Sequence, residues 1–265
     1  FTQKRAYEIL RSLVGSEMCI RDRAPDQFKD AKYSAERERS VGLGVMGFHS
    51  FLQKNRIPLE SVMAKSWNKK IFKQIDEKVN QASKDLAEER GACPDDESGA
   101  VRNAHLLAIA PNASSSIICG GTSPSIEPFR ANSFTHKTLS GSYQVRNKYL
   151  ERLLKKKGLN VEERENVWKD ITGANGSVQH LTILDDDEKE IFKTAPEINQ
   201  IYLVEHAHMR QEYICQSQSL NLFFPPDVNK DTNPHTRAEE KDENGVFLSN
   251  DIMDHQYTTP EEAIR

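Results

Sequence analysis

The feature that most constrains the fold is a passage from an apolar run, through a proline, into a group of small polar residues. Residues 104–109 (Ala-His-Leu-Leu-Ala-Ile) predict a buried strand, and Pro111 breaks that pattern. Asn112 can cap a helix whose first turn would hold Ala113 to Ser116. A helix N-terminus carries unpaired backbone N–H groups and the positive end of the helix dipole. The passage therefore predicts either an ordinary capped helix or a site for a phosphate or carboxylate group.

Three segments carry a resemblance to a known enzyme family. They are residues 102–154 (RNAHLLAIAPNASSS through RNKYLERLL), 37–49 (RERSVGLGVMGFH) and 210–223 (RQEYICQSQSLNLF). Together they resemble the C-terminal half of the large subunit of class I ribonucleotide reductase, and they follow one another in that family's order. The likeness runs from about Arg23 to Asp231.

The resemblance implies a substrate-binding role for the turn after Pro111. In the family, the loop and helix start at this place hold the diphosphate of the substrate. The matching residues here are Pro111, Asn112, Ala113, Ser114, Ser115 and Ser116. Some family members have an acidic residue where Ala113 stands, so the resemblance implies a main-chain contact there. The family's radical cysteine, its redox cysteine pair and its adjacent tyrosines have no counterpart in this sequence, so no catalytic residue is assigned.

The family fold is a ten-stranded α/β barrel made of two five-stranded halves. The resemblance implies that this chain forms an incomplete, helix-rich part of that α/β barrel, with exposed apolar edges. Residues 13–23 resemble a translated sequencing adapter, which predicts a non-native leader at 1–22. We expect a partial barrel domain at 23–231 and a divergent polar tail at 232–265. Both end segments are expected to pack poorly against the rest.

Local patterns in the first half predict two long helices. The first covers 35–54, where glycines at 42, 44 and 47 predict the close approach of another element. Their GxGxxG spacing matches a dinucleotide-binding turn, but no buried strand precedes them, so that site is not predicted. The second covers 60–90. Its apolar stripe is expected in the core, with Gly91 ending the helix; the stripe comprises Ile71, Ile75, Val79, Ala82 and Leu86.

The second half predicts a hairpin followed by further helices. The hairpin covers 133–147 with Gly141 at its turn, and Asn175-Gly176 marks another turn. Helices are expected near 147–157, 162–172, 185–194 and 196–213, and a strand at 219–224. In the last helix, Ile198, Ile201, Tyr202 and Met209 are expected to face inward.

Composition excludes several classes of function. The net charge is −4, which gives no reason to expect nucleic acid as a partner, and the basic cluster at 152–157 is interpreted as a solvated helix face. No apolar run reaches membrane-spanning length and no secretory signal is present, so we expect a cytoplasmic protein without a membrane partner. The four cysteines form no CxxC pair, and His206 and His208 point to different helix faces, so no metal site is expected.

The resemblance implies a radical reaction that reduces ribonucleoside diphosphates to deoxyribonucleotides for DNA replication. It implies, for the full-length enzyme, a second large subunit, a small subunit whose metal centre generates the radical, and thioredoxin or glutaredoxin as reductant. No cofactor is expected in this chain, and the family's allosteric and ATP-binding sites lie N-terminal to the matched region. Two other interpretations stay open. They are a non-catalytic nucleotide- or anion-binding module, and a decayed structural fragment.

Overall fold

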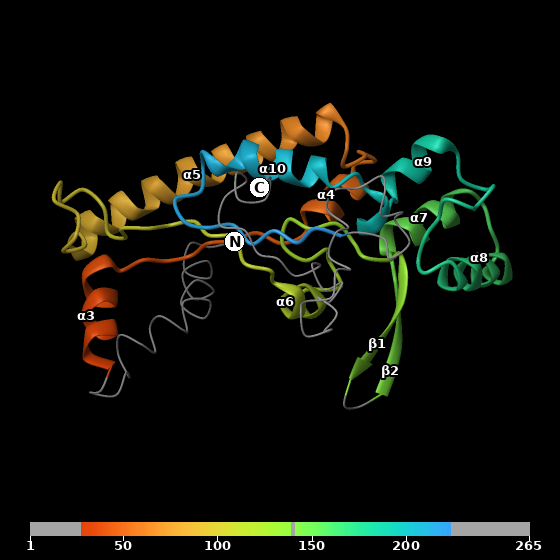
Figure 1. Ribbon diagram of the computed structural model, residues 1–265, viewed down its shortest axis with the longest axis horizontal. Helices are drawn as coiled ribbons and strands as arrows, with labels where there is room; N and C mark the ends of the chain where they lie inside the picture. Colours follow the sequence, from red (N-terminus) through yellow and green to blue (C-terminus); the bar gives the residue numbers. More distant parts are fainter. Residues whose placement is uncertain (1–27, 139–140, 224–265) are drawn as a thin grey trace, which may run out of the picture. The chain divides into compact units, whose positions relative to one another are not determined.

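The fold is described from a computed structural model over residues 28–138 and 141–223 (Figure 1). The described residues divide into two compact units. Unit 1 comprises 28–44, 70–109 and 212–217, and unit 2 comprises 45–69, 110–211 and 218–223. The predicted leader at 1–22 and the tail at 232–265 lie outside the described residues.

Unit 1 begins with a short helix, and the predicted continuous helix over 35–54 is wrong. Helix α3 spans Lys29–Glu38, and Arg39 closes it in the left-handed conformation with φ of 51°. The chain is then non-helical up to Gly47, which has φ of 86°, and α4 (Phe48–Lys54) begins in unit 2. The close approach predicted from the glycines is confirmed, because a Cβ on Gly42 would lie 3.3 Å from the Cβ of Ala108.

The apolar run predicted as a buried strand over 104–109 is buried only at Leu107 and Ile109, and it is held by single bridges rather than as a continuous strand. On one side it runs parallel to residues 41–43, where Leu43 N–H donates to Leu106 O at 2.8 Å. On the other side Gln216 N–H donates to Leu107 O at 3.2 Å. Leu107 and Ile109 are buried, so this segment is the centre of unit 1.

Helix α5 (Val62–Arg90) confirms the predicted helix, but its apolar stripe does not form the buried face. Gly91 ends the helix with φ of 82°, and its N–H donates to Ala87 O. In unit 1 the buried positions are Phe72, Ser83 and Ala87, whereas the stripe residues are half-buried and Ala82 is exposed. Hydrogen bonds explain why Ser83 lies on the buried face. Its hydroxyl accepts the N–H groups of residues 102 and 103, both at 3.1 Å.

Unit 2 contains the remaining elements. They are α4, α6 (Ala113–Ile118), β1 (Ser133–Thr138), β2 (Gly141–Arg146), α7 (Lys148–Lys156), α8 (Val161–Gly173), α9 (Asp186–Ile191), the 3-10 turn η2 (Ala195–Glu197) and α10 (Ile201–Gln211). The antiparallel register of β1 and β2 runs from Ser133↔Arg146 to Thr138↔Gly141, which confirms the predicted hairpin. Figure 1 shows the hairpin extending away from the helices of unit 2.

Polar caps set the starts of the unit 2 helices. The Asn147 side chain accepts the N–H groups of residues 149 and 150 at the start of α7. Asn160 caps α8 and Asp185 caps α9, each through a capping box. The predicted helices at 185–194 and 196–213 are shorter than expected, because η2 intervenes and holds a proline. Ile201 is exposed rather than inward, and residues 219–223 form no strand.

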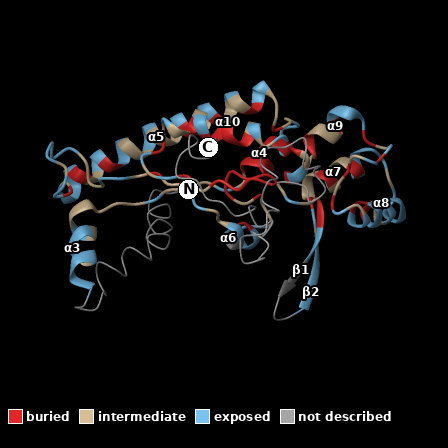
Figure 2. Cartoon of the chain, in the orientation of Figure 1, coloured by how far each residue is buried: buried red, intermediate tan, exposed pale blue. Residues whose placement is uncertain are grey.

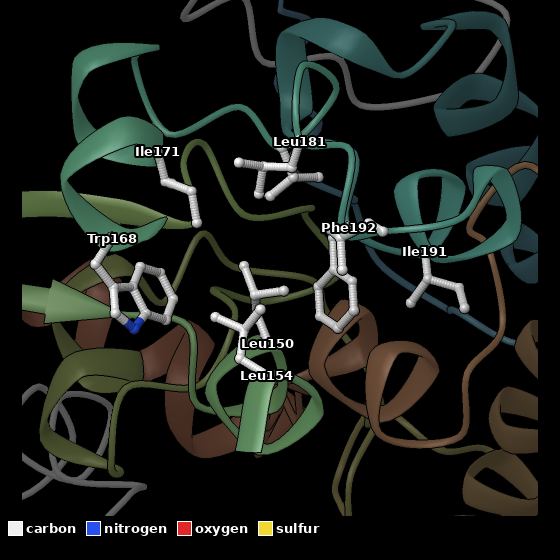
Figure 3. Packing of buried hydrophobic residues seen from close by; sticks show 9 residues of the cluster. Leu150, Leu154, Trp168, Ile171, Leu181, Ile191 and Phe192 are labelled. Atoms are coloured by element: carbon white, nitrogen blue, oxygen red, sulfur yellow. The ribbon is translucent and has the colours of Figure 1, made fainter. Parts of the chain in front are cut away.

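The hydrophobic core of unit 2 joins α7, α8 and the segment that leads to η2. Its members are apolar side chains with little exposure, and they are Leu150, Leu154, Trp168, Ile171, Val178, Leu181, Leu184, Ile191 and Phe192 (Figure 3). Figure 2 shows buried residues gathered on α4 and α10, whereas most of α8 and the hairpin are exposed. In the described part of the chain, no helix combines the length and apolar character needed to cross a membrane.

Candidate functional site

The turn before α6 is held by its backbone rather than by a side-chain cap. Asn112 occupies the N-cap position in the left-handed conformation, with φ of 50° and ψ of 29°. A capping side chain requires an extended backbone at that position. The Asn112 side chain instead donates from Nδ2 to Val45 O at 3.4 Å. The predicted cap by Asn112 is therefore wrong, although Asn112 does stand at the helix start.

Among the described residues, three backbone N–H groups at the start of α6 find no acceptor. Ser116 N–H donates to Asn112 O at 3.0 Å and so closes the first turn. The N–H groups of Ala113, Ser114 and Ser115 precede that bond and have no acceptor among the described residues. The N–H group of Ser116 is therefore used inside the helix, although Ser116 is one of the residues that match the family's phosphate turn.

The predicted site residues differ in their exposure. Ala113 and Ser115 are exposed, and Pro111 and Asn112 are half-buried. Ser116 is only 3% exposed, and its hydroxyl donates to Ala113 O at 2.6 Å, so that hydroxyl is used inside the turn. Ser114 lies in the helix backbone, and its side chain is outside the described structure. The groups that an anion can reach are therefore mainly backbone donors.

The far end of α6 is fixed by α4. Thr122 N–H donates to Ser116 O at 3.1 Å, and Gly47 N–H donates to Ser123 O at 2.9 Å. Ser50 and Ser123 exchange backbone-to-hydroxyl bonds of 3.1 and 2.8 Å. A Cβ on Gly47 would lie 2.6 Å from the Thr122 hydroxyl. The predicted close approach at Gly47 is thus confirmed, and its partner is the loop that follows α6.

A buried polar cluster surrounds α10, and sequence reasoning did not find it. Arg210 Nη1 donates to Asn68 Oδ1 at 2.9 Å, and its Nε donates to Gln218 Oε1 at 2.7 Å. Asn68 in turn donates to His206 O at 2.8 Å. Burial lowers the pKa of Arg210 to about 9. In the sequence, Arg210 and Gln218 fall in one motif, which is the only signal that they could meet. Asn68 is far away along the chain, so no local pattern linked it to them.

A second buried pair lies between the segment after α6 and the last described segment. Asn221 Nδ2 donates to Glu127 Oε1 at 2.6 Å. Both residues belong to segments singled out by the resemblance, but nothing in the sequence indicated that they meet. Their bond ties the loop that begins at α6 to the end of unit 2.

The described residues offer little for metal or thiol chemistry. They contain no group of three or more His, Cys, Asp or Glu side chains placed to hold a metal ion. Cys93 is a buried free thiol, and Cys119 and Cys215 are exposed free thiols. The open N–H groups at the start of α6 are hydrogen-bond donors of the kind that suits an anion. A partly buried extended segment that leads into a turn of open N–H groups is an arrangement of α/β proteins that bind phosphates.

Known proteins share this sequence and fold. The profile of the family described as "Ribonucleotide reductase, barrel domain" matches residues 17–100 and 96–240. The ribonucleoside-diphosphate reductase large subunit of Invertebrate iridescent virus 3 is 50% identical over 206 residues, which cover 78% of this chain and 33% of that protein. The putative large subunit of Frog virus 3 (isolate Goorha) is 47% identical over 197 residues, which cover 74% and 34%.

A solved structure agrees with these relatives. The Actinobacillus ureae class Id ribonucleotide reductase alpha subunit superposes with a TM-score of 0.68 and 42% identity, covering 76% of this chain and 36% of that chain. The chain therefore belongs to the ribonucleotide reductase family and corresponds to a part of the large subunit that falls in its barrel domain. It spans about a third of the length of these relatives. The predicted class, an incomplete and helix-rich α/β barrel, is confirmed.

Proposed function

We propose that this chain supplies the substrate-phosphate-binding turn of a ribonucleoside-diphosphate reductase. The observation that carries the proposal is the set of three open N–H groups at Ala113, Ser114 and Ser115. They follow a partly buried extended segment in a chain whose relatives are named ribonucleoside-diphosphate reductase large subunits. The ligand is the diphosphate of a ribonucleotide.

The magnitudes support binding without a lysine. A hydrogen bond to a charged group contributes roughly 1.5–3 kcal/mol, so three donors hold a diphosphate with useful affinity. The exposed Ser115 lies in the same turn and offers a further donor. The role of the turn is to orient the substrate by its phosphates, which is a proximity effect rather than bond chemistry.

Binding of ADP to the 265-residue chain tests the proposal directly. Ala113→Asp places a carboxylate among the donors and is expected to weaken ADP binding about tenfold or more. The matched control is Ile118→Asp, which adds the same charge at the other end of α6, where the side chain is 85% exposed. Equal affinity of both variants for ADP would contradict the assignment.

A second variant removes a donor without adding charge. Ser114→Pro deletes one N–H group, and proline is tolerated in the first turn of a helix. In a complete large subunit we expect a raised substrate KM when Ser114→Pro is combined with Ser115→Ala. Unchanged KM and turnover in that enzyme would show that the turn is not part of the substrate site. ADP binding by the chain together with unchanged kinetics would favour the alternative of a non-catalytic nucleotide-binding module.

Family membership also supports proposals about partners of the complete enzyme. These are a second large subunit, a small subunit whose metal centre generates the radical, and thioredoxin or glutaredoxin as reductant. We further propose a cytoplasmic setting, a role in DNA replication, and control by ATP at sites outside the matched region. Capture of a purified small subunit by the complete large subunit, but not by this chain, is the expected result.

A further inference from the structure

A hollow of about 210 Å³ lies among α4, α7 and α9 in unit 2, and it shares no lining residue with the turn before α6. Lys54 and Arg56 reach it from the end of α4, and Arg152 and Lys156 reach it from α7. Among the described residues, the one acidic residue in the lining is Glu188 of α9. The hollow therefore carries a net charge of +3 in a chain whose net charge is −4.

The floor of this hollow is rigid. Ile191 and Phe192 line it and belong to the hydrophobic core, where Figure 3 shows Phe192 between Ile191 and the two leucines of α7, Leu150 and Leu154. Leu153, also in the lining, packs against the same core. The cationic side chains thus stand on packed helices rather than on a loose loop.

Buried amide bonds hold the three elements in register. Gln53 is 2% exposed, and its Oε1 accepts a hydrogen bond of 2.8 Å from Asn147, the cap of α7. Its Nε2 donates to Ile191 O, at the end of α9, at 3.3 Å. One buried side chain therefore fixes the distance between the α4 cations and the α7 cations.

The charges of the hollow are only partly compensated. Glu188 pairs with Arg56 at 3.2 Å and with Lys157 at 2.7 Å, so it is already neutralised by two cations. Lys54, Arg152 and Lys156 pair with no carboxylate of any described residue. Like charges held near one another repel, and an anion bound between them relieves that repulsion.

We propose that this hollow binds the di- or triphosphate group of a small molecule, at a site separate from the turn before α6. The hollow of about 210 Å³ has room for a polyphosphate group, and its four cationic lining side chains match the several negative charges of such a group. Lysine binds phosphate as a point charge and arginine through its planar fork, and both kinds are present. The proposal does not rest on the proposed function, because the two sites share no residue.

The test is a titration of the 265-residue chain in the Ala113→Asp background, which suppresses the α6 turn. Inorganic pyrophosphate is added, and the amide NMR signals of residues 152–156 and 188–192 are followed. We expect saturable shifts of these signals, weakened about threefold to tenfold by Lys156→Gln. The matched control is Lys155→Gln, whose residue lies next in the same helix, pairs with Glu151 at 3.3 Å and does not line the hollow.

The outcomes separate the possible explanations. Equal loss in the two lysine variants would show general attraction to a basic helix and would overturn the site. Malonate, a dicarboxylate, binding as tightly as pyrophosphate would overturn the phosphate assignment. Shifts seen only when Ala113 is intact would assign the signal to the α6 turn and overturn this proposal alone. Tighter binding of ADP than of pyrophosphate would indicate that the site takes the phosphates of a nucleotide. Equal affinity for the two would indicate a site for free polyphosphate. Both results support the site.

Discussion

At the scale of single residues, two buried histidines make the fold sensitive to acid. His49 Nδ1 accepts the N–H of Phe129 at 3.0 Å, which requires that nitrogen to be unprotonated. His206 Nε2 donates to Leu59 O at 3.0 Å, and its Nδ1 is buried without a hydrogen-bond partner in the described structure. Burial lowers the pKa of His49 to about 3 and that of His206 to about 4.

The free energy of unfolding should therefore fall as pH decreases below about 6.5. The unfolded chain binds protons first, because its imidazoles keep the ordinary pKa of about 6.5, so the contribution is complete above that pH and is lost toward pH 4 and then 3. Between pH 7 and 5.5 we expect a loss of about 2 kcal/mol from the pair, measured by urea unfolding. His206→Gln should reduce the change in the free energy of unfolding with pH, whereas His180→Gln, at an exposed position, should not. A level free energy over this range would contradict the assignment.

The residue types of the candidate site were predictable, but their individual roles were not. Pro111 and the small residues after it indicated a helix start, which the structure has. The left-handed backbone of Asn112 and the buried hydroxyl of Ser116 depend on Val45 and Ala113 O, and a local pattern carries no information about such contacts. For the same reason Arg210 and Asn68 could not be paired from the sequence.

At the scale of elements, the turn after α8 is fixed by a close backbone approach. Gly176 has φ of 84°, and a Cβ there would lie 2.3 Å from the Cβ and 2.8 Å from the Cα of Ala131. Gly176 O also accepts the N–H of Asn132 at 3.0 Å. The predicted Asn175-Gly176 turn is thus confirmed, and it anchors the start of the hairpin.

We expect Gly176→Ala to destabilise the chain by roughly 3 kcal/mol or more, because backbone must move in addition to the left-handed penalty. Gly158→Ala is the matched control, since its φ of 86° is almost the same and nothing lies within 4 Å of its Cβ. The control should cost only about 1–2 kcal/mol in chemical unfolding. Equal losses in the two variants would mean that the close approach at Ala131 does not exist.

The contact of α7 with α8 gives a second prediction at this scale. Leu154 is fully buried in the core cluster, so Leu154→Ala should cost about 2–5 kcal/mol through lost burial and the cavity left behind. Val161→Ala, at the exposed first position of α8, should change the free energy of unfolding by less than about 0.5 kcal/mol. A small loss at Leu154 would show that α7 does not pack on this core.

The positions of the helices were predicted from the sequence more accurately than the faces that the helices bury. Caps such as Asn160 and Asp185 act within four residues, so the start of a helix depends on local sequence. The buried face of α5 depends instead on residues 102 and 103, which bond to Ser83 and make a polar residue more buried than the stripe at 71, 75 and 79. The helix predicted over 35–54 is wrong for a similar reason, because the backbone of Val41 and Leu43 pairs with residues 105–108 instead of continuing a helix.

At the scale of the whole molecule, the family was recognisable because the motifs follow the family's order along the chain. This order does not depend on a correct prediction of the local structure of each motif. Each of the three resembling segments contributes residues to both units, and each unit is built from stretches that are far apart in the sequence. Periodicity cannot indicate that residues 41–43, 105–108 and 216 lie side by side. Order along the chain identified the barrel domain, whereas the contacts had to come from the structure.

The last prediction concerns activity. The sequence has no adjacent tyrosine pair, and none of its four cysteines lies in a motif resembling the radical or redox cysteines of the family. Binding and orientation alone do not abstract a hydrogen atom or reduce a ribose. We therefore expect no deoxynucleotide from the purified chain, with or without a small subunit and a dithiol reductant, while a complete large subunit under the same conditions is active. Product above the no-protein control would show that the chain holds a radical site that its sequence does not reveal.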